Sequence, residues 1–167
     1  SGTSYCGRGT DWSHLSIQDA RYEFGKAADM GKLHMCQWLA EYYDFSALDI
    51  VSNQNRALRY ATQNGHIKVC QWLVEHFNLT VGNGNKKNRL DVRVANNSAF
   101  RQAAHNGHLE VCQYLTMKFN LTKKDVTCRN NYALRKSAQK GHLEVCQWLT
   151  HHFSLTKTDA QTNKNEA

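Results

Sequence analysis

A nine-residue string that occurs four times constrains the fold of this chain more than any other feature. It reads GHLEVCQWL from Gly141, GHLEVCQYL from Gly107, GHIKVCQWL from Gly65 and, in a weaker form, GKLHMCQWL from Gly31. Successive glycines lie 34, 42 and 34 residues apart, so the unit has about 34 residues and one insertion of eight residues interrupts the series. Such a fixed period predicts an array in which each unit buries its apolar face against its neighbours.

The residues on both sides of each glycine predict a pair of helices. Short phrases rich in small residues precede the glycines: EFGKAADM from Glu23, ALRYATQN from Ala57, AFRQAAHN from Ala99 and ALRKSAQK from Ala133. After the last glycine, apolar residues follow helical spacing: Leu143, Val145, Cys146, Trp148, Leu149 and Phe153. A glycine in the left-handed conformation can end the first helix and reverse the chain. We therefore expect two helices in each unit, joined at its glycine.

A short third helical turn is predicted where one unit gives way to the next. Each unit closes with an aromatic residue, any residue, an apolar residue and a hydroxyl residue. In three cases an Asp stands three positions after the hydroxyl: Ser46 and Asp49, Thr122 and Asp125, Thr156 and Asp159. A hydroxyl can accept a hydrogen bond from a free helical amide, and an acid is favoured at a helix N-terminus, together worth about 1 kcal/mol.

These motifs together resemble the ankyrin repeat. The phrase Ala-Leu-Arg-x-Ala/Ser-Ala-x-x-Gly-His-Leu-x-Val-Cys-x-x-Leu is similar to the family's T-P-L-H-x-A-A-x-x-G-H-x-x-V-V-x-x-L-L. The family's Thr-Pro opening is missing from this proline-free chain, and the hydroxyl-x-x-Asp turn replaces its glycine-marked hairpin. The resemblance implies an all-α, ankyrin-like helical repeat solenoid with β-hairpin fingers reduced or absent. The Cys- and Trp-rich form is similar to arrays in protists and large DNA viruses.

The repeat register divides the chain into segments of a single array spanning residues 1–167. We expect an N-terminal cap at 1–22, units at 23–46, 47–80, 91–122 and 123–156, an inserted loop at 81–90, and the start of a truncated further unit at 157–167. The last segment follows the register of the fourth unit, because DAQTNKNEA from Asp159 matches DVTCRNNYA from Asp125. The chain is therefore expected to be a fragment of a longer array.

The cysteines are expected to be structural. Four of them occupy one column, where a small buried hydrophobe suffices: Cys36, Cys70, Cys112 and Cys146. A His stands four residues before three of them, a spacing that zinc could use. The first unit has Lys32 instead, however, and neighbouring units of such stacks lie roughly 10 Å apart, so we expect no metal and no cofactor. Cys6 and Cys128 lie outside the column and favour a reducing, intracellular compartment, cytoplasmic or nuclear.

Two further columns have a structural and a binding interpretation. The aromatic column is expected to add core area, although it could also form a peptide-binding stripe: Trp38, Trp72, Tyr114 and Trp148. The arginine column is expected to bond neighbouring backbone, with ligand contact as the alternative: Arg59, Arg101 and Arg135.

The sequence predicts a binding protein and not an enzyme. It contains no glycine-rich phosphate loop, nucleophile elbow or paired carboxylates. The resemblance implies a scaffold or adaptor module that holds a partner protein along its concave face. By position, the partner-binding residues are the variable pairs before each glycine: Asp29, Met30, Gln63, Asn64, His105, Asn106, Gln139 and Lys140. The inserted loop adds a candidate basic finger of Lys86, Lys87 and Arg89, unless it is an idle solvated loop.

The charge distribution supports a second hypothesis. Residues 1–80 hold seven Lys/Arg against eight Asp/Glu, and residues 81–167 hold fourteen against six, so the net charge of +7 comes from the C-terminal half. A basic half could bind nucleic acid or phosphate, which is the alternative function. No apolar run is long enough to span a membrane, and we expect a monomer.

Overall fold

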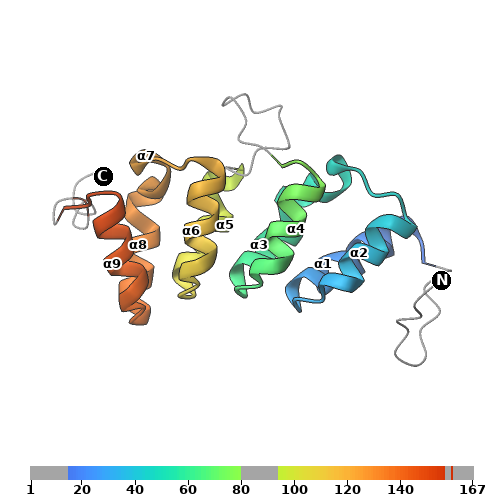
Figure 1. Cartoon of the computed structure of the whole chain (residues 1–167), viewed down its shortest axis with the longest axis horizontal. Coiled ribbons are helices and arrows are strands. Elements are labelled where there is room, and N and C mark those ends of the chain that lie inside the picture. The colour runs from blue at the N-terminus through green and yellow to red at the C-terminus, as the bar shows by residue number, and fades with distance from the viewer. Residues whose placement is uncertain (1–14, 80–93, 157–158, 160–167) are drawn as a thin grey trace, which may run out of the picture.

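Helix pairs follow one another along a single axis in the computed structural model, which describes residues 15–79, 94–156 and 159 (Figure 1). The pairs are α1 (Ile17–Asp29) with α2 (Leu33–Tyr42), α3 (Ala47–Gln63) with α4 (Ile67–His76), α5 (Val94–His105) with α6 (Leu109–Phe119), and α8 (Cys128–Lys140) with α9 (Leu143–His152). A short helix, α7 (Lys123–Val126), precedes α8. The described residues contain no strand, which confirms the expectation of an all-helical solenoid without β-fingers.

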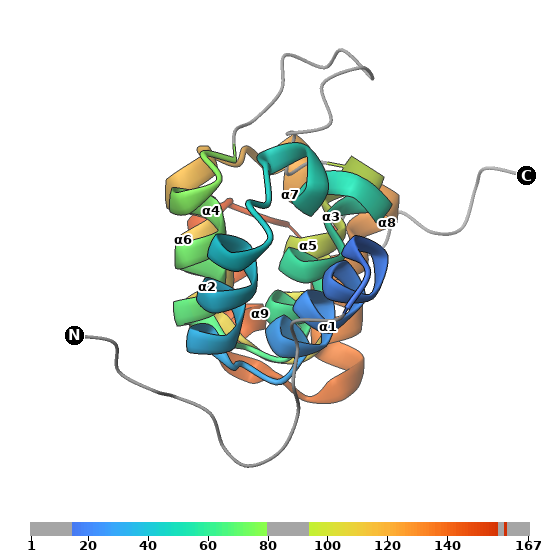
Figure 2. The same ribbon diagram turned by 90° about the vertical axis from the view of Figure 1, so that its right-hand side faces the viewer.

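The helices form two rows, seen end-on in Figure 2. The inner row contains the first helix of each pair, α1, α3, α5 and α8, and the outer row contains α2, α4, α6 and α9. Consecutive inner helices contact each other far more extensively than consecutive outer helices do. Small side chains permit this close approach, because they are fully buried between inner helices: Ala28, Ala61, Ala103, Ala104 and Ser137. A stack that packs more tightly along one row curves toward it, so the inner row lines the concave side.

The core lies between the rows and is built from the repeated string. Its last leucine is almost completely buried in every unit: Leu39, Leu73, Leu115 and Leu149. Cys36, Cys70 and Cys112 are fully buried as well, and burial raises the pKa of each thiol to about 12. Cys146 is half-buried, since no described helix follows α9. The interpretation of this column as buried hydrophobes is confirmed for the first three cysteines.

Left-handed residues end both helices of a unit. The glycines that close the inner helices have φ between +69° and +80°, as the sequence predicts: Gly31, Gly65, Gly107 and Gly141. A second left-handed residue, which was not predicted from the sequence, follows each outer helix with φ between +45° and +48°: Asp44, Asn78, Asn120 and Ser154. Asn and Asp tolerate this conformation better than other residues with side chains, which explains their presence at three of the four positions.

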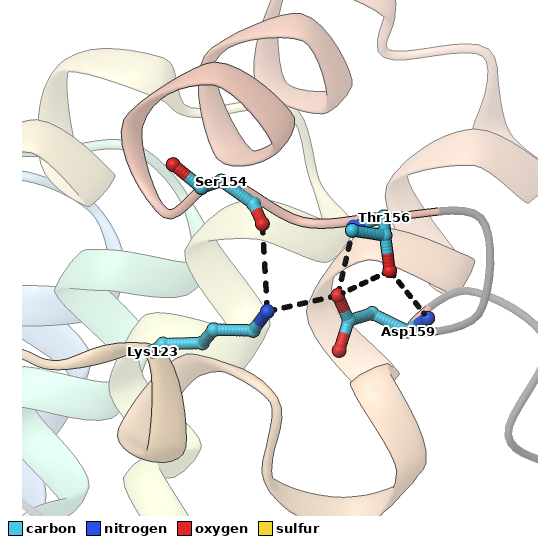
Figure 3. Close-up of polar contacts among 4 residues, drawn as sticks. All are labelled: Lys123, Ser154, Thr156 and Asp159. Atoms are coloured by element: carbon cyan, nitrogen blue, oxygen red, sulfur yellow. Dashed lines mark hydrogen bonds and ion pairs between the residues drawn. The ribbon is translucent and has the colours of Figure 1, made fainter.

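The predicted helical turn at the start of a unit is confirmed. The Ser46 amide donates to the Asp49 carboxylate, and the Thr122 amide donates to the Asp125 carboxylate. The turn stays separate as α7 in the fourth unit, whereas in the second unit it continues into α3. Near the C-terminus Asp159 joins two such turns, because it accepts from the Thr156 amide and from Lys123 Nζ at 2.7 and 2.9 Å (Figure 3).

The N-terminal helix crosses the boundary that was expected between the cap and the first unit. Helix α1 begins at Ile17, with the Ser16 hydroxyl accepting from the Asp19 amide at 3.2 Å. It therefore runs through the boundary expected between residues 22 and 23. The segment assigned to an N-terminal cap and the first helix of the first unit share one continuous helix.

Candidate partner-binding surface

From the second unit on, an imidazole packs against the glycine of the preceding unit. His66 Nε2 lies 2.9 Å from the Asp29 carbonyl oxygen, and His108 Nε2 lies 2.8 Å from that of Gln63. A carbonyl oxygen only accepts hydrogen bonds, so Nε2 carries the proton in both rings. A Cβ atom added to Gly31, Gly65 or Gly107 would lie only 2.5 to 2.6 Å from the Nδ1 atom of the next unit's histidine. The glycine therefore provides space for a neighbouring ring as well as a turn.

The residue pairs predicted to bind a partner lie at the C-terminal ends of the inner helices. Two of them already join neighbouring units: Asn64 Nδ2 donates to the Asp29 carbonyl oxygen at 2.9 Å, and Asn106 Nδ2 donates to that of Gln63 at 2.7 Å. Gln139 and Lys140 are exposed, as is Met30, whose exposed fraction is 56%. The eight residues thus line one edge of the inner row, and their role in binding stays a prediction. Lys86, Lys87 and Arg89 lie outside the described residues.

Two groups of aromatic rings and cations, which together we name the aromatic–cation ladder, lie along the inner row. Its first part is Lys26, Tyr22, Arg56 and Tyr60, with Lys26 Nζ 5.7 Å and Arg56 Cζ 5.4 Å from the Tyr22 ring centre, and Arg56 Cζ 5.1 Å from that of Tyr60. Its second part is Arg101, Tyr132 and His105, with Arg101 Cζ 4.9 Å from the Tyr132 ring centre and the His105 ring stacked 6.2 Å from it. Contacts of this kind hold cations over ring faces.

Most of this ladder was not predicted from the sequence, although the sequence contains a signal for it. Aromatic and basic residues stand four positions apart on one face of two inner helices: Tyr22 and Lys26, Arg56 and Tyr60. Only Arg101 and His105 were singled out beforehand. In the arginine column, the structural interpretation is confirmed for Arg135, whose Nε donates to the Asn130 carbonyl oxygen at 2.8 Å.

Charge is distributed unequally between the rows. Helix α8 carries Arg129, Arg135, Lys136 and Lys140 and no acidic residue, whereas its outer partner α9 carries Glu144 and neither Lys nor Arg. Helix α1, at the other end of the inner row, has three acidic residues against two basic ones. Positive charge is therefore concentrated at the C-terminal end of the concave side.

Burial and nearby cations change the pKa of His105. The pKa of its imidazole is lowered by burial and further by the charges of Lys140, Lys136 and His142. Burial likewise lowers the pKa of Arg101. His105 is therefore neutral at physiological pH, so the positive charge of this surface comes from Lys and Arg and does not depend on His105.

The outer row presents its aromatic column mainly to the core. Trp72, Tyr114 and Trp148 are half-buried against the core, and Trp72 lies 6.2 Å from Phe24 and 5.6 Å from Phe77 between ring centres. Trp38 differs, because it is 40% exposed and stacks on Tyr42 at 5.0 Å. Core packing is confirmed for three of the four rings, and the stripe interpretation has support only at Trp38.

A family comparison decides what this architecture is. The family model described as ankyrin repeats (many copies) matches residues 26–74 and 101–150. The chain belongs to the ankyrin-repeat family. Ankyrin repeats generally act as non-enzymatic modules for protein–protein interaction. Comparison with curated proteins finds no match.

Three further properties of the described ankyrin array concern metal ligands, cysteines and membrane-spanning helices. In the described part of the chain, no group of three or more His, Cys, Asp or Glu side chains is placed to hold a metal ion. The five cysteines there are all free thiols. Among the same residues, no helix combines the length and apolarity that crossing a membrane requires.

Proposed function

We propose that this ankyrin array binds an acidic segment of a partner protein along its inner row. One observation carries the proposal: most Lys and Arg residues of the described helices lie on the concave row, and α8 has four of them and no acidic residue, while the adjacent helix α9 of the outer row has no Lys or Arg. Opposite charge steers association and selects among partners. A protein with negative charges along an extended segment is therefore the complementary ligand.

The inner row offers more than charge to such a segment. The aromatic–cation ladder supplies Tyr rings that are already held by neighbouring cations, so little side-chain entropy is lost when a partner covers them. Tyr22 is 52% exposed and Met30 adds apolar area at the edge formed by the pairs before each glycine. Aromatic and Arg side chains are enriched where interfaces gain most of their free energy.

A peptide library tests this proposal without knowledge of the natural partner. We expect panning of a random displayed library against the folded chain to enrich peptides rich in Asp and Glu. Reversal of two exposed or half-exposed cations on α8, Lys136→Glu with Lys140→Glu, should weaken their binding roughly tenfold or more, equivalent to about 1.4 kcal/mol. The matched control reverses two exposed cations of the outer row, Lys68→Glu with Lys118→Glu, and changes the net charge by the same amount.

The control decides between a local and a general charge effect. If the outer-row pair weakens binding as much as the inner-row pair, or if the enriched peptides are not acidic, the proposed face is wrong. Circular dichroism and the midpoint of thermal unfolding establish that both double variants remain folded.

Nucleic acid is the alternative ligand, and the basic helix α8 is the observation that favours it. Fluorescence anisotropy with a labelled single-stranded oligonucleotide measures this binding over a range of salt concentrations. Release of condensed counterions would make the logarithm of the binding constant fall steeply with the logarithm of salt concentration. Tight, salt-sensitive oligonucleotide binding that the Lys136→Glu, Lys140→Glu pair abolishes, together with failure of the peptide selection, would replace the protein ligand by nucleic acid.

A further inference from the structure

A polar cleft opens between the inner helices α1 and α3. Its volume is about 220 Å³, and its wall includes Arg21, Tyr22 and Gly25 from α1 and Asp49 and Arg56 from α3. A water molecule occupies about 30 Å³ in the liquid, so the cleft has room for a small organic group. Phe24 and Phe45 add apolar surface to the wall.

The cleft exists where the first unit departs from the others. Gly25 stands six residues before Gly31, the position at which the other units carry Arg59, Arg101 and Arg135. Arg56 of the next unit reaches over this glycine, and a Cβ atom added to Gly25 would lie 3.9 Å from Arg56 Nε. The guanidinium of Arg56 is held in place between the Tyr22 and Tyr60 rings. Because Gly25 has no side chain, space remains beside the fixed guanidinium of Arg56.

The wall of the cleft has an excess of positive charge. Arg21 forms an ion pair with Asp49, which also accepts hydrogen bonds from Ser46. The Ser46 hydrogen bonds and the pairing with Arg21 hold the pKa of Asp49 below its ordinary value, so this carboxylate is ionised and neutralises Arg21. Arg56 has no acidic partner among the described residues. One positive charge therefore remains unbalanced by the other residues of the wall.

Two hydrogen-bond donors on arginines that line the cleft are also unused. Arg21 Nε and Arg56 Nε are both buried, and neither has a hydrogen-bond partner among the described residues. A buried donor without a partner is unfavourable, and native structures rarely retain one unless something else satisfies it. An anionic acceptor within reach of both would satisfy the two donors and the unbalanced charge together.

We infer that this cleft receives the carboxylate of an Asp or Glu side chain from the partner protein, with Arg56 as its main cation. The inference rests on the proposed function and names the chemistry of one contact within it. A carboxylate matches the donor geometry of Arg, and its aliphatic stem suits a wall that contains Phe24 and Phe45.

The first experiment observes the two donors directly. The probe is N-acetyl-glutamate N-methylamide, whose only charge is the side-chain carboxylate, and the control is the neutral glutamine analogue. The Nε–Hε signals of Arg21 and Arg56, assigned with the Arg21→Lys and Arg56→Lys variants, are followed by NMR during each titration. We expect both signals to shift saturably with the glutamate probe alone. Absence of a shift, or equal shifts with the glutamine analogue, would overturn the inference.

The second experiment links the cleft to the partner. An acidic peptide selected from the library is compared with versions in which each Asp or Glu is replaced by its amide. One replacement should weaken binding to the wild-type chain roughly tenfold and have little further effect on Arg56→Gln, which marks the pair as coupled. Arg59→Gln removes the same charge from α3 outside the cleft wall and should retain the full effect of that replacement. Gly25→Leu, which fills the cleft and keeps both arginines, should behave like Arg56→Gln.

The outcomes separate this inference from the proposed function. If selected peptides depend on Lys136 and Lys140 but are indifferent to Arg56→Gln and Gly25→Leu, the cleft assignment fails and the inner-row proposal survives. If no acidic peptide is selected but the glutamate probe saturates the arginine signals, the proposed function fails and the assignment to a partner side chain fails with it.

Discussion

The two rows contain the same number of long helices in the described part of the array, but they differ in which sequence positions repeat. Outer helices follow the repeated string, and their Leu and Cys residues are buried in one column after another. Inner helices repeat mainly at the alanines that face other inner helices, while their accessible positions change from Tyr22 to Arg56 to Tyr132. The positions that repeat are therefore those that the scaffold requires. The positions that vary on the inner row are those at which the array can discriminate between ligands.

The largest effect should come from a buried residue of the outer row. Leu73→Ala removes a side chain that is completely buried in the middle of the array. We expect it to lower the free energy of unfolding by about 2 to 5 kcal/mol, because it loses buried apolar area and leaves a cavity. Leu143→Ala is the matched control, since Leu143 lies in the same row but is 65% exposed, and its effect should stay within about 0.5 kcal/mol. Urea unfolding followed by circular dichroism measures both, and equal losses would show that repetition in this row does not report burial.

The second-largest effect should come from a glycine between the inner and the outer helix of a unit. Gly65→Ala and Gly141→Ala both place a side chain on a residue with φ near +75°, at +74° and +78°. The left-handed conformation alone should cost about 1 to 2 kcal/mol in each. At Gly65 the new Cβ also meets the His108 ring, whereas nothing lies within 4 Å at Gly141. Displacement of that ring breaks its hydrogen bond to Gln63, so Gly65→Ala should cost about 1 to 3 kcal/mol more.

A double variant identifies the cause of that difference. In a His108→Ala background the ring is absent, so Gly65→Ala should then cost no more than Gly141→Ala does in the wild-type chain. Denaturant unfolding of the four chains gives the coupling free energy. A cost of Gly65→Ala that is unchanged by His108→Ala would assign the effect to backbone conformation alone.

The fold could be predicted from the sequence because its determinants are local and repeated. The helical spacing around Leu149, the turn at Gly141 and the capping pair of Ser46 and Asp49 each act within a few residues, and the period fixes how the units stack. The left-handed residue after each outer helix was also local, yet the sequence signal at Asp44 or Ser154 is too varied to identify it.

The surface chemistry could be predicted only in part because it depends on contacts between units. The sequence indicated that Gly107 turns the chain, but the packing of His142 on that glycine requires knowledge of which residues of the next unit lie above it. The cleft beside Gly25 also depends on a contact between units, since Arg56, which lies next to this glycine, is 31 residues further along the chain. Residues before each glycine were identified by their variability, which does not show that Asn64 and Asn106 also connect neighbouring units.

Within the outer row, thiol reactivity should distinguish an internal unit from the last described one. Cys112 is fully buried with a pKa raised to about 12, whereas Cys146 is half-buried at the same position of its repeat. Only the thiolate reacts readily with alkylating agents. In the native chain we expect iodoacetamide, located by mass spectrometry of peptides, to modify Cys146 and half-buried Cys128 at least tenfold faster than Cys36, Cys70 or Cys112. Equal rates in native buffer would mean that the internal units open as often as the last one.

The smallest effect should come from Asp159, which connects unit starts and belongs to neither row. The Thr156 amide, together with Lys123, lowers the pKa of Asp159 from 3.8 to about 2 (Figure 3). Because the folded pKa is depressed, the ionised carboxylate stabilises the fold above pH 4, and this contribution is lost as the pH falls toward 2. Asp159→Asn should therefore unfold at slightly lower urea than the wild-type chain at pH 7, and the gap should narrow between pH 4 and pH 3. A gap that stays constant over this range would show that the charge of Asp159 does not stabilise the array and that the link acts only as a neutral cap.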